Sequence, residues 1–255
     1  MIGTRNIMKN KTCFLSIDVE EDLRADGQKS FRGAENLEEM LAIFKQFEAP
    51  ATLFVTGEAL ANYPELAKNW AVDFEIGCHG YWHRPLSQLP LAEREKGLVD
   101  FLGLKEVKGF RAVQNVIDNE QFPLLEKYGF LYDSSVVPNY PFLKKYIGYK
   151  GRAPLAPYHP AVGNHLEKGE MKILEIPLTP HLWGIPLVGT WLRKLGVGFY
   201  KILFFFYQPK FISFSMHSWD PILSDNYLKQ LAEMLAFLKK KNYHFLNSYE
   251  ISRNQ

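Results

Sequence analysis

The chain of 255 residues has two cysteines, no long apolar run and little net charge, and each shortage excludes a class of protein. Two cysteines, Cys13 and Cys78, cannot form a disulfide framework. Their apolar, strand-like surroundings predict small buried side chains. A formal net charge of +2 gives no sign of a nucleic-acid-binding surface. Residues 1–11 lack the apolar core of a secretory signal peptide, so we expect a cytoplasmic protein.

The rest of the composition is that of one enzyme-sized domain. With 47% hydrophobic residues, the chain can bury a full core. Strand-like and helix-like patterns alternate, with helices expected at 36–47, 89–102, 119–128 and from 227, and strands at 12–18, 51–56, 172–177 and 243–246. The first of these helices opens on Asn36 and Glu39, which resembles a capping box. The alternation predicts a single α/β domain over residues 1–255, a parallel barrel that is closed or nearly closed.

Two histidines four residues apart, His79 and His83, follow the strand-like run 74–77. Imidazoles at this spacing can turn toward one metal ion. Gly80 stands where a zincin-type metalloprotease carries its glutamate base, so a base has to come from elsewhere. Gly80 and Pro85 argue against a helix and place the pair on a turn at a strand end. Two histidines on a loop are about as often incidental as they are ligands, so the pair needs a third ligand.

A group of carboxylates ends the first apolar strand, where Asp18 is followed by Glu20 and Asp22. Burying a carboxylate is costly unless it is paired or bound to a metal ion. In an extended chain Asp18 and Glu20 point to the same side, so one can bind a metal ion while the other faces its water. The alternative is a solvated acidic turn in which Asp18 caps the next segment.

Three further strand-like runs end in a charged residue: Arg111 after 109–110, Asp133 after Tyr132, and His217 after 211–216. A lone histidine at a strand end is usually structural. In an alternating α/β fold, however, the carboxyl ends of the strands lie at one end of the sheet, where active sites collect. The five segments are therefore expected to bring their charges together.

In this order the five segments resemble the polysaccharide deacetylase family, which is also described as NodB-homology or carbohydrate esterase 4-like. The resemblance covers residues 13–220 and rests on motifs at 18–20, 79–83, 109–111, 133–135 and 217–220. They are most similar to the branch associated with exopolysaccharide and lipopolysaccharide gene clusters. The resemblance implies the distorted seven-stranded (β/α) barrel of that family.

The resemblance also implies a role for each site residue. Asp18 is implied to be the general base and His217 the general acid. One divalent metal ion is implied, zinc first, with cobalt, nickel or manganese as alternatives, and it has three ligands: Glu20, His79 and His83. Arg111 is implied to orient Asp18, and Asp133 to orient His217.

Two departures from the family pattern bear on this assignment. Many members have adjacent aspartates in the first motif, whereas here Val19 separates Asp18 from the longer Glu20. The third motif commonly continues from arginine into proline, whereas here Ala112 and Val113 follow. The identity of the metal ion and the backbone that holds the oxyanion both depend on these positions.

The expected activity is hydrolysis of a carbon–nitrogen bond. The resemblance implies a metal-dependent deacetylase that removes an acetyl, or a formyl, group from an amino sugar in a polysaccharide or a lipid-linked glycan precursor. One alternative is a hydrolase of a small non-carbohydrate amide, similar to allantoinase or imidase. Another is a catalytically silent sugar-binding relative.

Two regions are left open by the sequence. Residues 136–172 lack clear periodicity, and their tyrosines are expected either to line a sugar-binding wall or to belong to an exposed polar loop: Tyr140, Tyr146, Tyr149 and Tyr158. Residues 182–207 are apolar, aromatic and basic, but Gly, Pro and charge interrupt them too often for a transmembrane helix. They are expected either to touch the inner face of a membrane or to cover the barrel as a core helix.

Overall fold

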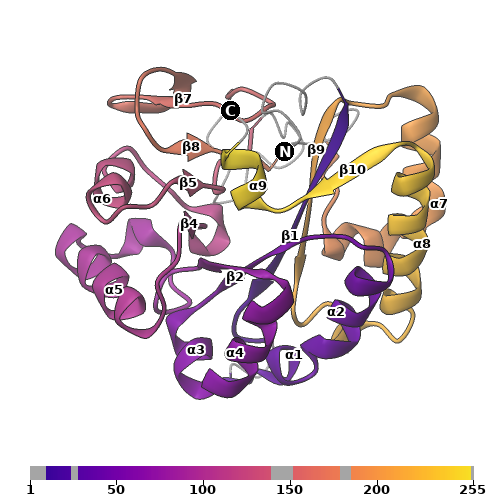
Figure 1. Cartoon of the computed structure of the whole chain (residues 1–255), viewed down its shortest axis with the longest axis horizontal. Helices are drawn as coiled ribbons and strands as arrows, with labels where there is room; N and C mark the ends of the chain where they lie inside the picture. The colour runs from indigo at the N-terminus through magenta and orange to yellow at the C-terminus, as the bar shows by residue number, and fades with distance from the viewer. Residues whose placement is uncertain (1–9, 24–27, 139–151, 179–184, 254–255) are drawn as a thin grey trace.

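One curved parallel sheet, with helices around its outside, makes up the molecule (Figure 1). The fold is seen in a computed structural model that describes residues 10–23, 28–138, 152–178 and 185–253. The strands of the main sheet are β1 (Lys11–Val19), β2 (Thr52–Val55), β3 (Glu75–Cys78), β4 (Gly109–Phe110), β5 (Tyr132–Asp133), β8 (Leu174–Glu175), β9 (Phe211–His217) and β10 (Tyr243–Leu246). A separate hairpin consists of β6 (Pro160–Ala161) and β7 (Asn164–Lys168).

Helices occupy most of the connections between these strands. They are α1 (Arg32–Glu35), α2 (Leu37–Gln46), α3 (Gly57–Asn62), α4 (Pro64–Asp73), α5 (Leu91–Leu104), α6 (Gln121–Lys127), α7 (Gly189–Phe206), α8 (Tyr227–Lys240) and α9 (Ser248–Ser252). Short 3₁₀ turns are found at Leu86–Gln88, Val113–Asn115 and Pro221–Leu223. In the described part of the chain, no helix is both long enough and apolar enough to cross a membrane.

Strand β1 lies at the centre of the sheet and uses both of its edges. On one edge it pairs with β9, from Thr12 opposite Phe211 to Asp18 opposite His217. On the other edge β10 pairs with residues 11–14, and β2 pairs with residues 16–19. Seven strands therefore follow one another in the order β9-β1-β2-β3-β4-β5-β8, with β10 beside the first half of β1. This curled seven-stranded sheet confirms the predicted barrel-type α/β fold.

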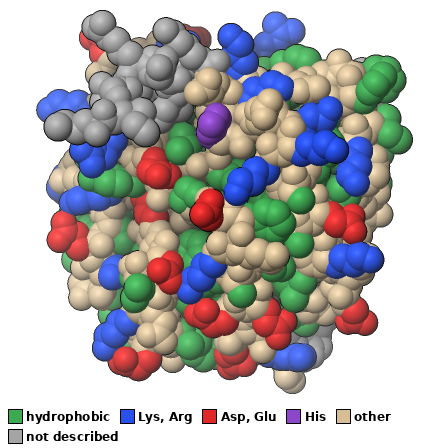
Figure 2. All heavy atoms as spheres, turned by 45° about the vertical axis from the view of Figure 1, so that its right-hand side comes forward, with side chains coloured by type: hydrophobic (Ala, Val, Ile, Leu, Met, Phe, Trp, Pro, Cys, Tyr) green, Lys and Arg blue, Asp and Glu red, His purple; other side chains and the backbone are tan. Residues whose placement is uncertain are grey.

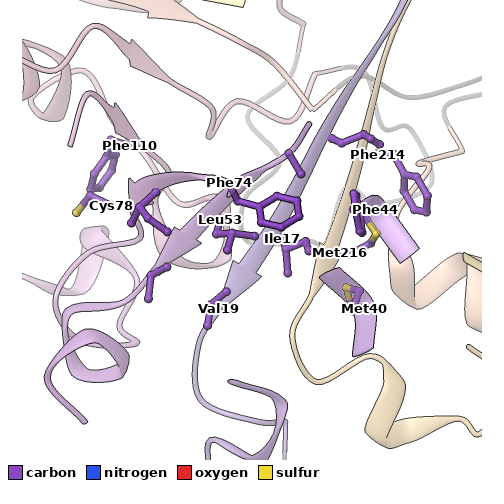
Figure 3. Close-up of a cluster of buried hydrophobic side chains, with 14 of the residues drawn as sticks. Ile17, Val19, Met40, Phe44, Leu53, Phe74, Cys78, Phe110, Phe214 and Met216 are labelled. Carbon is purple, nitrogen blue, oxygen red and sulfur yellow. The ribbon is translucent and has the colours of Figure 1, made fainter. Parts of the chain in front are cut away.

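The alternation of side chains along β1 creates two different layers. Ile17 and Val19 face the helices and lie near Phe44 of α2 and Leu53 of β2 (Figure 3). The alternate positions face the inside of the curled sheet, where Phe14 belongs to a second, smaller apolar cluster. Asp18 is therefore buried, 5% exposed, on the inner side of the strand rather than on a solvated turn.

Most expected elements are present, with corrections at their ends. The predicted helix 36–47 is α2, but Asn36 makes no side-chain cap; its amide instead donates to the carbonyl oxygen of Arg32. The cause is the preceding turn of helix, α1, which the sequence pattern did not reveal. Helices α3 and α4 were not expected either. Both cysteines are free and buried, as predicted, and burial raises the pKa of each thiol.

The two open regions are only partly described. Tyr140, Tyr146 and Tyr149 lie outside the described residues. Tyr158 is buried, and its hydroxyl donates to the carbonyl oxygen of His165 at 2.6 Å, so it does not belong to a sugar-binding wall. Within residues 182–207, positions 182–184 lie outside the description and the remainder forms the approach to α7 and α7 itself. This helix is kinked at Gly196, which has a φ of +74°.

Candidate active site

The carboxyl ends of β1, β3, β4 and β9 bring the predicted site residues together. Asp18 and His217 are register partners on β1 and β9, so their side chains start side by side. His79 directly follows β3, and its backbone N–H continues the ladder by donating to Val55. Gly80 then takes a left-handed conformation, with a φ of +74°, which favours glycine and turns the chain back toward the strand end. The predicted turn at the end of this strand is thus confirmed.

Glu20 contacts both histidines through one oxygen. Its Oε2 atom lies 3.0 Å from Nε2 of His79 and 3.0 Å from Nε2 of His83. Burial raises the pKa of Glu20, but the hydrogen bonds to the two imidazoles outweigh this and hold the pKa well below its usual range. Burial lowers the pKa of His83, and the hydrogen bond and charge of Glu20 outweigh that effect and raise it.

The tautomer of His79 shows that a cation is required between these groups. Nδ1 of His79 lies 2.9 Å from the carbonyl oxygen of Arg111, which can only accept, so Nδ1 carries a proton. In a neutral imidazole Nε2 then presents a lone pair, and that lone pair faces the lone pairs of the Glu20 carboxylate. Either a second proton on the ring or a metal ion has to lie between the two atoms. A backbone carbonyl on the far nitrogen is the usual support of a metal-binding histidine.

These three residues fit a divalent metal ion by their chemistry. One carboxylate and two imidazoles, with further positions left for water or substrate, are a common donor set of catalytic zinc. Among the described residues, no three His, Cys, Asp or Glu side chains are arranged to hold a metal ion as they stand, and Glu20 contacts both imidazoles directly. The donor atoms converge on one point, as the sequence predicted, and their identity as ligands stays a prediction.

Asp18 is held by Arg111, as expected. Nη1 of the guanidinium donates to Oδ1 of Asp18 at 2.7 Å and also reaches the hydroxyl groups of Ser16 and Ser215. Arg111 has no exposed surface, and its guanidinium carbon lies 4.2 Å from the centre of the Phe54 ring. The close carboxylate and hydroxyl partners compensate the charge of this buried cation, and the guanidinium group holds the Asp18 side chain in place.

His217 stands across the site from the other two histidines. Its ring stacks on Trp219, with centroids 4.2 Å apart, and its Nε2 lies 3.9 Å from Oε1 of Glu20. The side chain keeps 26% of its surface exposed, so it can reach a bound molecule. Burial lowers its pKa, but the neighbouring Asp220 carboxylate, together with the charges of Glu20 and Asp18, raises the pKa to about 9. The proton that a general acid needs is therefore favoured on this ring.

The prediction that Asp133 orients His217 is wrong, because Asp220 has that position. Oδ2 of Asp220 accepts from the backbone N–H of His217 at 2.9 Å and lies 3.6 Å from Nδ1 of its ring. Asp133 instead accepts two hydrogen bonds from Ser135, one from the backbone and one from the hydroxyl. The sequence signal for Asp220 was its place three residues after His217, where one turn of chain can bring the side chain back.

A cavity of about 350 Å³ opens onto these groups. Its polar wall contains Asp18, Glu20 and the three histidines, and its other side is largely apolar, lined by Leu23, Val137, Leu178, Val188, Trp191 and Trp219. This volume falls within the usual range of small-molecule sites. Trp191 and Trp219 were not predicted to belong to the site; Trp219 also donates from Nε1 to Oε1 of Glu20 at 3.3 Å.

Residues 112–116 form the rim of this cavity beside Arg111. Gln114 and Asn115 both have positive φ, 54° and 55°, and the N–H of Val116 donates to the carbonyl oxygen of Val113 at 3.2 Å. These features define a type I′ turn built without glycine. The backbone after Arg111 therefore makes a tight turn, and both turn residues line the cavity.

Comparisons with known proteins agree with this arrangement. Residues 8–100 match the polysaccharide deacetylase family, and this range contains four of the five acidic and imidazole groups around the cavity. A peptidoglycan deacetylase of Helicobacter pylori is 31% identical over 117 residues, which are 43% of this chain and 40% of that protein. A peptidoglycan deacetylase-like protein of Gibberella zeae is 36% identical over 93 residues, 33% of this chain and 27% of that protein. The matches thus span less than half of these relatives.

Solved structures share the fold over nearly the whole chain. A protein of Mycobacterium smegmatis described as a polysaccharide deacetylase superposes with a TM-score of 0.70 at 19% identity, over 95% of this chain and 90% of that one. Puue allantoinase superposes with a TM-score of 0.69 at 16% identity, over 95% and 89%. A carbohydrate esterase 4 pseudoenzyme of Bacillus anthracis gives 0.59 at 15% identity, over 95% and 66%. At these identities the likeness establishes the fold alone.

Proposed function

Because residues 8–100 match the polysaccharide deacetylase family, we propose that the chain is a metal-dependent hydrolase that removes an acetyl, or a formyl, group from an amino sugar. The observation that supports the proposal is the carboxylate oxygen of Glu20 against the Nε2 atoms of His79 and His83, an arrangement that either a metal ion or a second proton on the His79 ring would satisfy. Asp18 and His217 lie on the two adjoining strand ends, where a base and an acid are needed.

A divalent ion held by Glu20, His79 and His83, zinc before cobalt, nickel or manganese, would supply an acidified water and polarise the amide carbonyl. Asp18 is the base in this proposal. Its Oδ1 is fixed by Arg111, so the second oxygen is directed to the cavity side and can accept the proton of the attacking water. The apolar cavity wall excludes bulk water from this transfer.

His217 is the acid in this proposal. Amide nitrogen is a poor leaving group until it is protonated, so a ring that holds its proton near neutral pH matches the need. Trp219 fixes the plane of the ring from one face, and Asp220 fixes its backbone. The acid and the base in this proposal therefore start from adjoining strand ends.

The function is tested by metal content and turnover together. We expect metal-loaded protein to release acetate or formate from N-acylated hexosamine oligosaccharides and chelator-treated protein to lose this activity. Asp18→Asn should keep the metal and lose about 10²–10⁴-fold in turnover, since it retains the shape of the side chain without its basicity. Glu20→Gln should lose metal affinity first, and His79→Ala should abolish stoichiometric metal.

Other outcomes would assign another function. Cleavage of small cyclic amides without any cleavage of N-acylated sugars would indicate an allantoinase-like or imidase-like hydrolase. Sugar binding with neither metal nor turnover would indicate a silent relative. Metal retention in Glu20→Gln with metal loss in Asp18→Asn would exchange the roles of the two acids.

We also propose that the protein touches the inner face of a membrane through the second half of α7, where a lipid-linked precursor would be met. Phe205 and Phe206 are 79% and 64% exposed, and Ile202 is 60% exposed on the same helix. The helix carries no acidic residue, and Lys201 is exposed beside these apolar side chains. The surface that includes this side of the molecule shows hydrophobic and basic side chains next to one another (Figure 2). Rings and cations of this kind suit an anionic bilayer interface.

The core-helix alternative accounts for the other face of α7. Leu192, Tyr200, Leu203 and Phe204 are buried against the sheet and α8. Among the described aromatic rings of α7, Trp191, in the first turns, lines the cavity. Phe205 and Phe206 lie at the other end of the helix, where the chain turns into β9.

A further inference from the structure

Two acidic side chains with no exposed surface, Asp133 and Glu175, lie next to each other on β5 and β8. They are register partners in a parallel pair, so both side chains leave the sheet on the same face. The mechanism proposed above uses neither of them. Burying charge is costly, so the protonation state of a buried carboxyl pair that binds neither metal nor substrate has to be explained.

The hydrogen bonds leave one oxygen of this pair in need of a proton. Both oxygens of Asp133 accept from Ser135, at 2.9 Å from the backbone N–H and 2.8 Å from the hydroxyl. Oε1 of Glu175 accepts from the N–H of Val136 at 3.0 Å. Within the described chain no donor reaches the buried Oε2 of Glu175. A buried carboxylate oxygen without a hydrogen-bond donor is energetically costly, whereas a protonated carboxyl oxygen can donate a hydrogen bond to Asp133.

The surrounding charges also favour one proton on the pair. The cation beside it is Arg111, and the guanidinium group already neutralises Asp18 at 2.7 Å. Tyr158 forms a backbone bridge with Glu175, and burial together with the charges of the two acids raises the pKa of its hydroxyl. Burial and the charge of Asp133 raise the pKa of Glu175 well above its usual range. Burial also raises the pKa of Asp133.

We propose that Asp133 and Glu175 share a single proton, carried on Oε2 of Glu175, and that this proton-bridged pair, with one negative charge instead of two, positions the backbone beside Arg111. The connection is direct. The hydroxyl of Ser135 donates to Asp133 and accepts from the N–H of Ala112 at 2.8 Å, and Ala112 opens the turn on the cavity rim. Asp133 and Glu175 are thus positioning residues; their effect on turnover rests on the proposed function, whereas the shared proton does not.

The proton can be observed without any activity. In the wild-type protein we expect an infrared carbonyl band of a protonated, buried carboxyl group at about pH 8, far above the usual pKa of glutamic acid. Glu175→Gln should remove this band, and the exposed Glu170→Gln should keep it. Because the amide of Glu175→Gln still donates to Asp133, that variant should fold and keep turnover close to the wild type.

The dependence of stability on pH gives a second readout. A folded-state pKa raised above the unfolded value means that the folded protein binds the extra proton, so wild-type stability should fall as the pH rises above the usual glutamate range. Glu175→Gln lacks this proton, so the thermal midpoint of the variant should rise relative to that of the wild type as the pH increases above the usual glutamate range. The Glu170→Gln control should follow the wild-type curve.

Turnover tests the positioning role. Glu175→Ala removes the donor to Asp133 and should lower kcat by about 10–100-fold, with a smaller change in KM and metal content unchanged. Absence of the infrared band, or parallel stability curves for wild type and Glu175→Gln, would overturn the shared proton. Wild-type kcat in a folded Glu175→Ala would overturn the positioning role. If the wild-type protein hydrolysed no substrate, the proposed function would fail. The infrared band and the stability curves would still show whether the two acids share a proton.

Discussion

His217, Trp219 and Asp220 form a unit within four residues of chain. The indole stacks on the imidazole, and the carboxylate accepts from the histidine backbone while lying near the ring. A Cβ atom on Gly189 would come within 2.0 Å of Oδ2 of Asp220, so the first residue of α7 has to be small for Asp220 to keep this position. The acid is therefore held by its own strand end and by the start of a neighbouring helix.

This unit predicts a difference between substrates. His217→Ala should lower amide cleavage by about 10²–10⁴-fold and cleavage of an activated aryl acetate far less, because an acidic leaving group departs without protonation. Asp220→Asn should also lower amide cleavage more than ester cleavage. The loss on the amide should be smaller than in His217→Ala, about 10–100-fold. The ratio of the two kcat/KM values is the measurement.

Asp225→Asn, a nearby exposed acid, serves as the control and should leave the ratio unchanged. Equal losses on amide and ester in His217→Ala would mean that the ring binds or positions the substrate rather than donating a proton.

For single residues, the sequence could predict which side chains lie together in the site, but not every contact between them. His79 and His83 were expected at a strand end from their spacing and from Gly80, and they are found there with Glu20. The partner of His217 was expected to be Asp133. Both Asp133 and Asp220 follow a strand, and only the side-chain directions separate them: Asp133 turns toward Glu175, while Asp220 turns back beneath the ring. Such directions depend on tertiary packing.

Among the elements, the type I′ turn at Gln114 and Asn115 has an unusual composition. A left-handed conformation is costly for residues with a side chain, and such turns prefer glycine. Both side chains line the cavity next to Asp18 and His79. Strain kept at such a place is expected to be compensated by a contribution to function.

Replacing Asn115 with glycine should therefore separate stability from activity. Asn115→Gly should raise the free energy of unfolding by about 0.5–1 kcal/mol, because it relieves the left-handed conformation. It should lower kcat/KM for the sugar substrate by removing a polar side chain from the cavity rim. Chemical denaturation and steady-state kinetics measure the two effects.

Asn242 provides a matched control for this turn. It also has a left-handed conformation, with a φ of 62°, but it is exposed between α8 and β10. Asn242→Gly should raise stability similarly and leave kcat/KM unchanged. A loss of stability in Asn115→Gly would show that the asparagine, not the backbone conformation, holds the turn together.

The elements that the sequence revealed are those with a strong pattern. Strands β1, β2 and β10 are apolar runs, and α8 repeats its apolar side chains at helical spacing. The hairpin of β6 and β7 was missed because its residues are mostly polar and its turn depends on Gly163, at a φ of +78°. Helices α3 and α4 were missed because only Tyr63, the cap residue, separates them and each is short.

On the scale of the whole molecule, α7 joins two distant places. Its first turns line the cavity, and its last turns expose Phe205 and Phe206 where the chain approaches the start of β9. The wild-type protein should sediment with anionic vesicles at low salt and be released as salt screens the lysines. Replacing both phenylalanines with serine should weaken this binding at least about 10-fold, given the size of aromatic burial.

Val72→Ser is the control for this experiment, because Val72 is equally exposed, at 78%, on α4. It should sediment as the wild type does. A wild-type protein that ignores anionic vesicles at low salt would contradict the membrane contact and favour a soluble amino sugar or oligosaccharide as substrate.

The overall barrel was predictable because strands and helices alternate, and because the parallel connection rule leaves few arrangements. The pairing of β1 with three different strands was not predictable from the sequence. It depends on where β10 stops along β1 and where β2 begins, which is a matter of curvature rather than of any local pattern. The position of the cavity could be predicted from the strand ends, whereas the residues of its apolar wall could not.

The pairing of β1 with β9 has a consequence for the order in which the protein can be made. A growing chain that has reached residue 200 contains β1, β2 and β3, yet one edge of β1 still lacks its partner. Contacts between residues this far apart form slowly, and an unpaired strand edge invites association with other chains. Asp18 meets His217 only when that strand is present, so the candidate site is incomplete in a partly synthesised chain. Until then, the nascent protein is expected to depend on chaperones to shield β1.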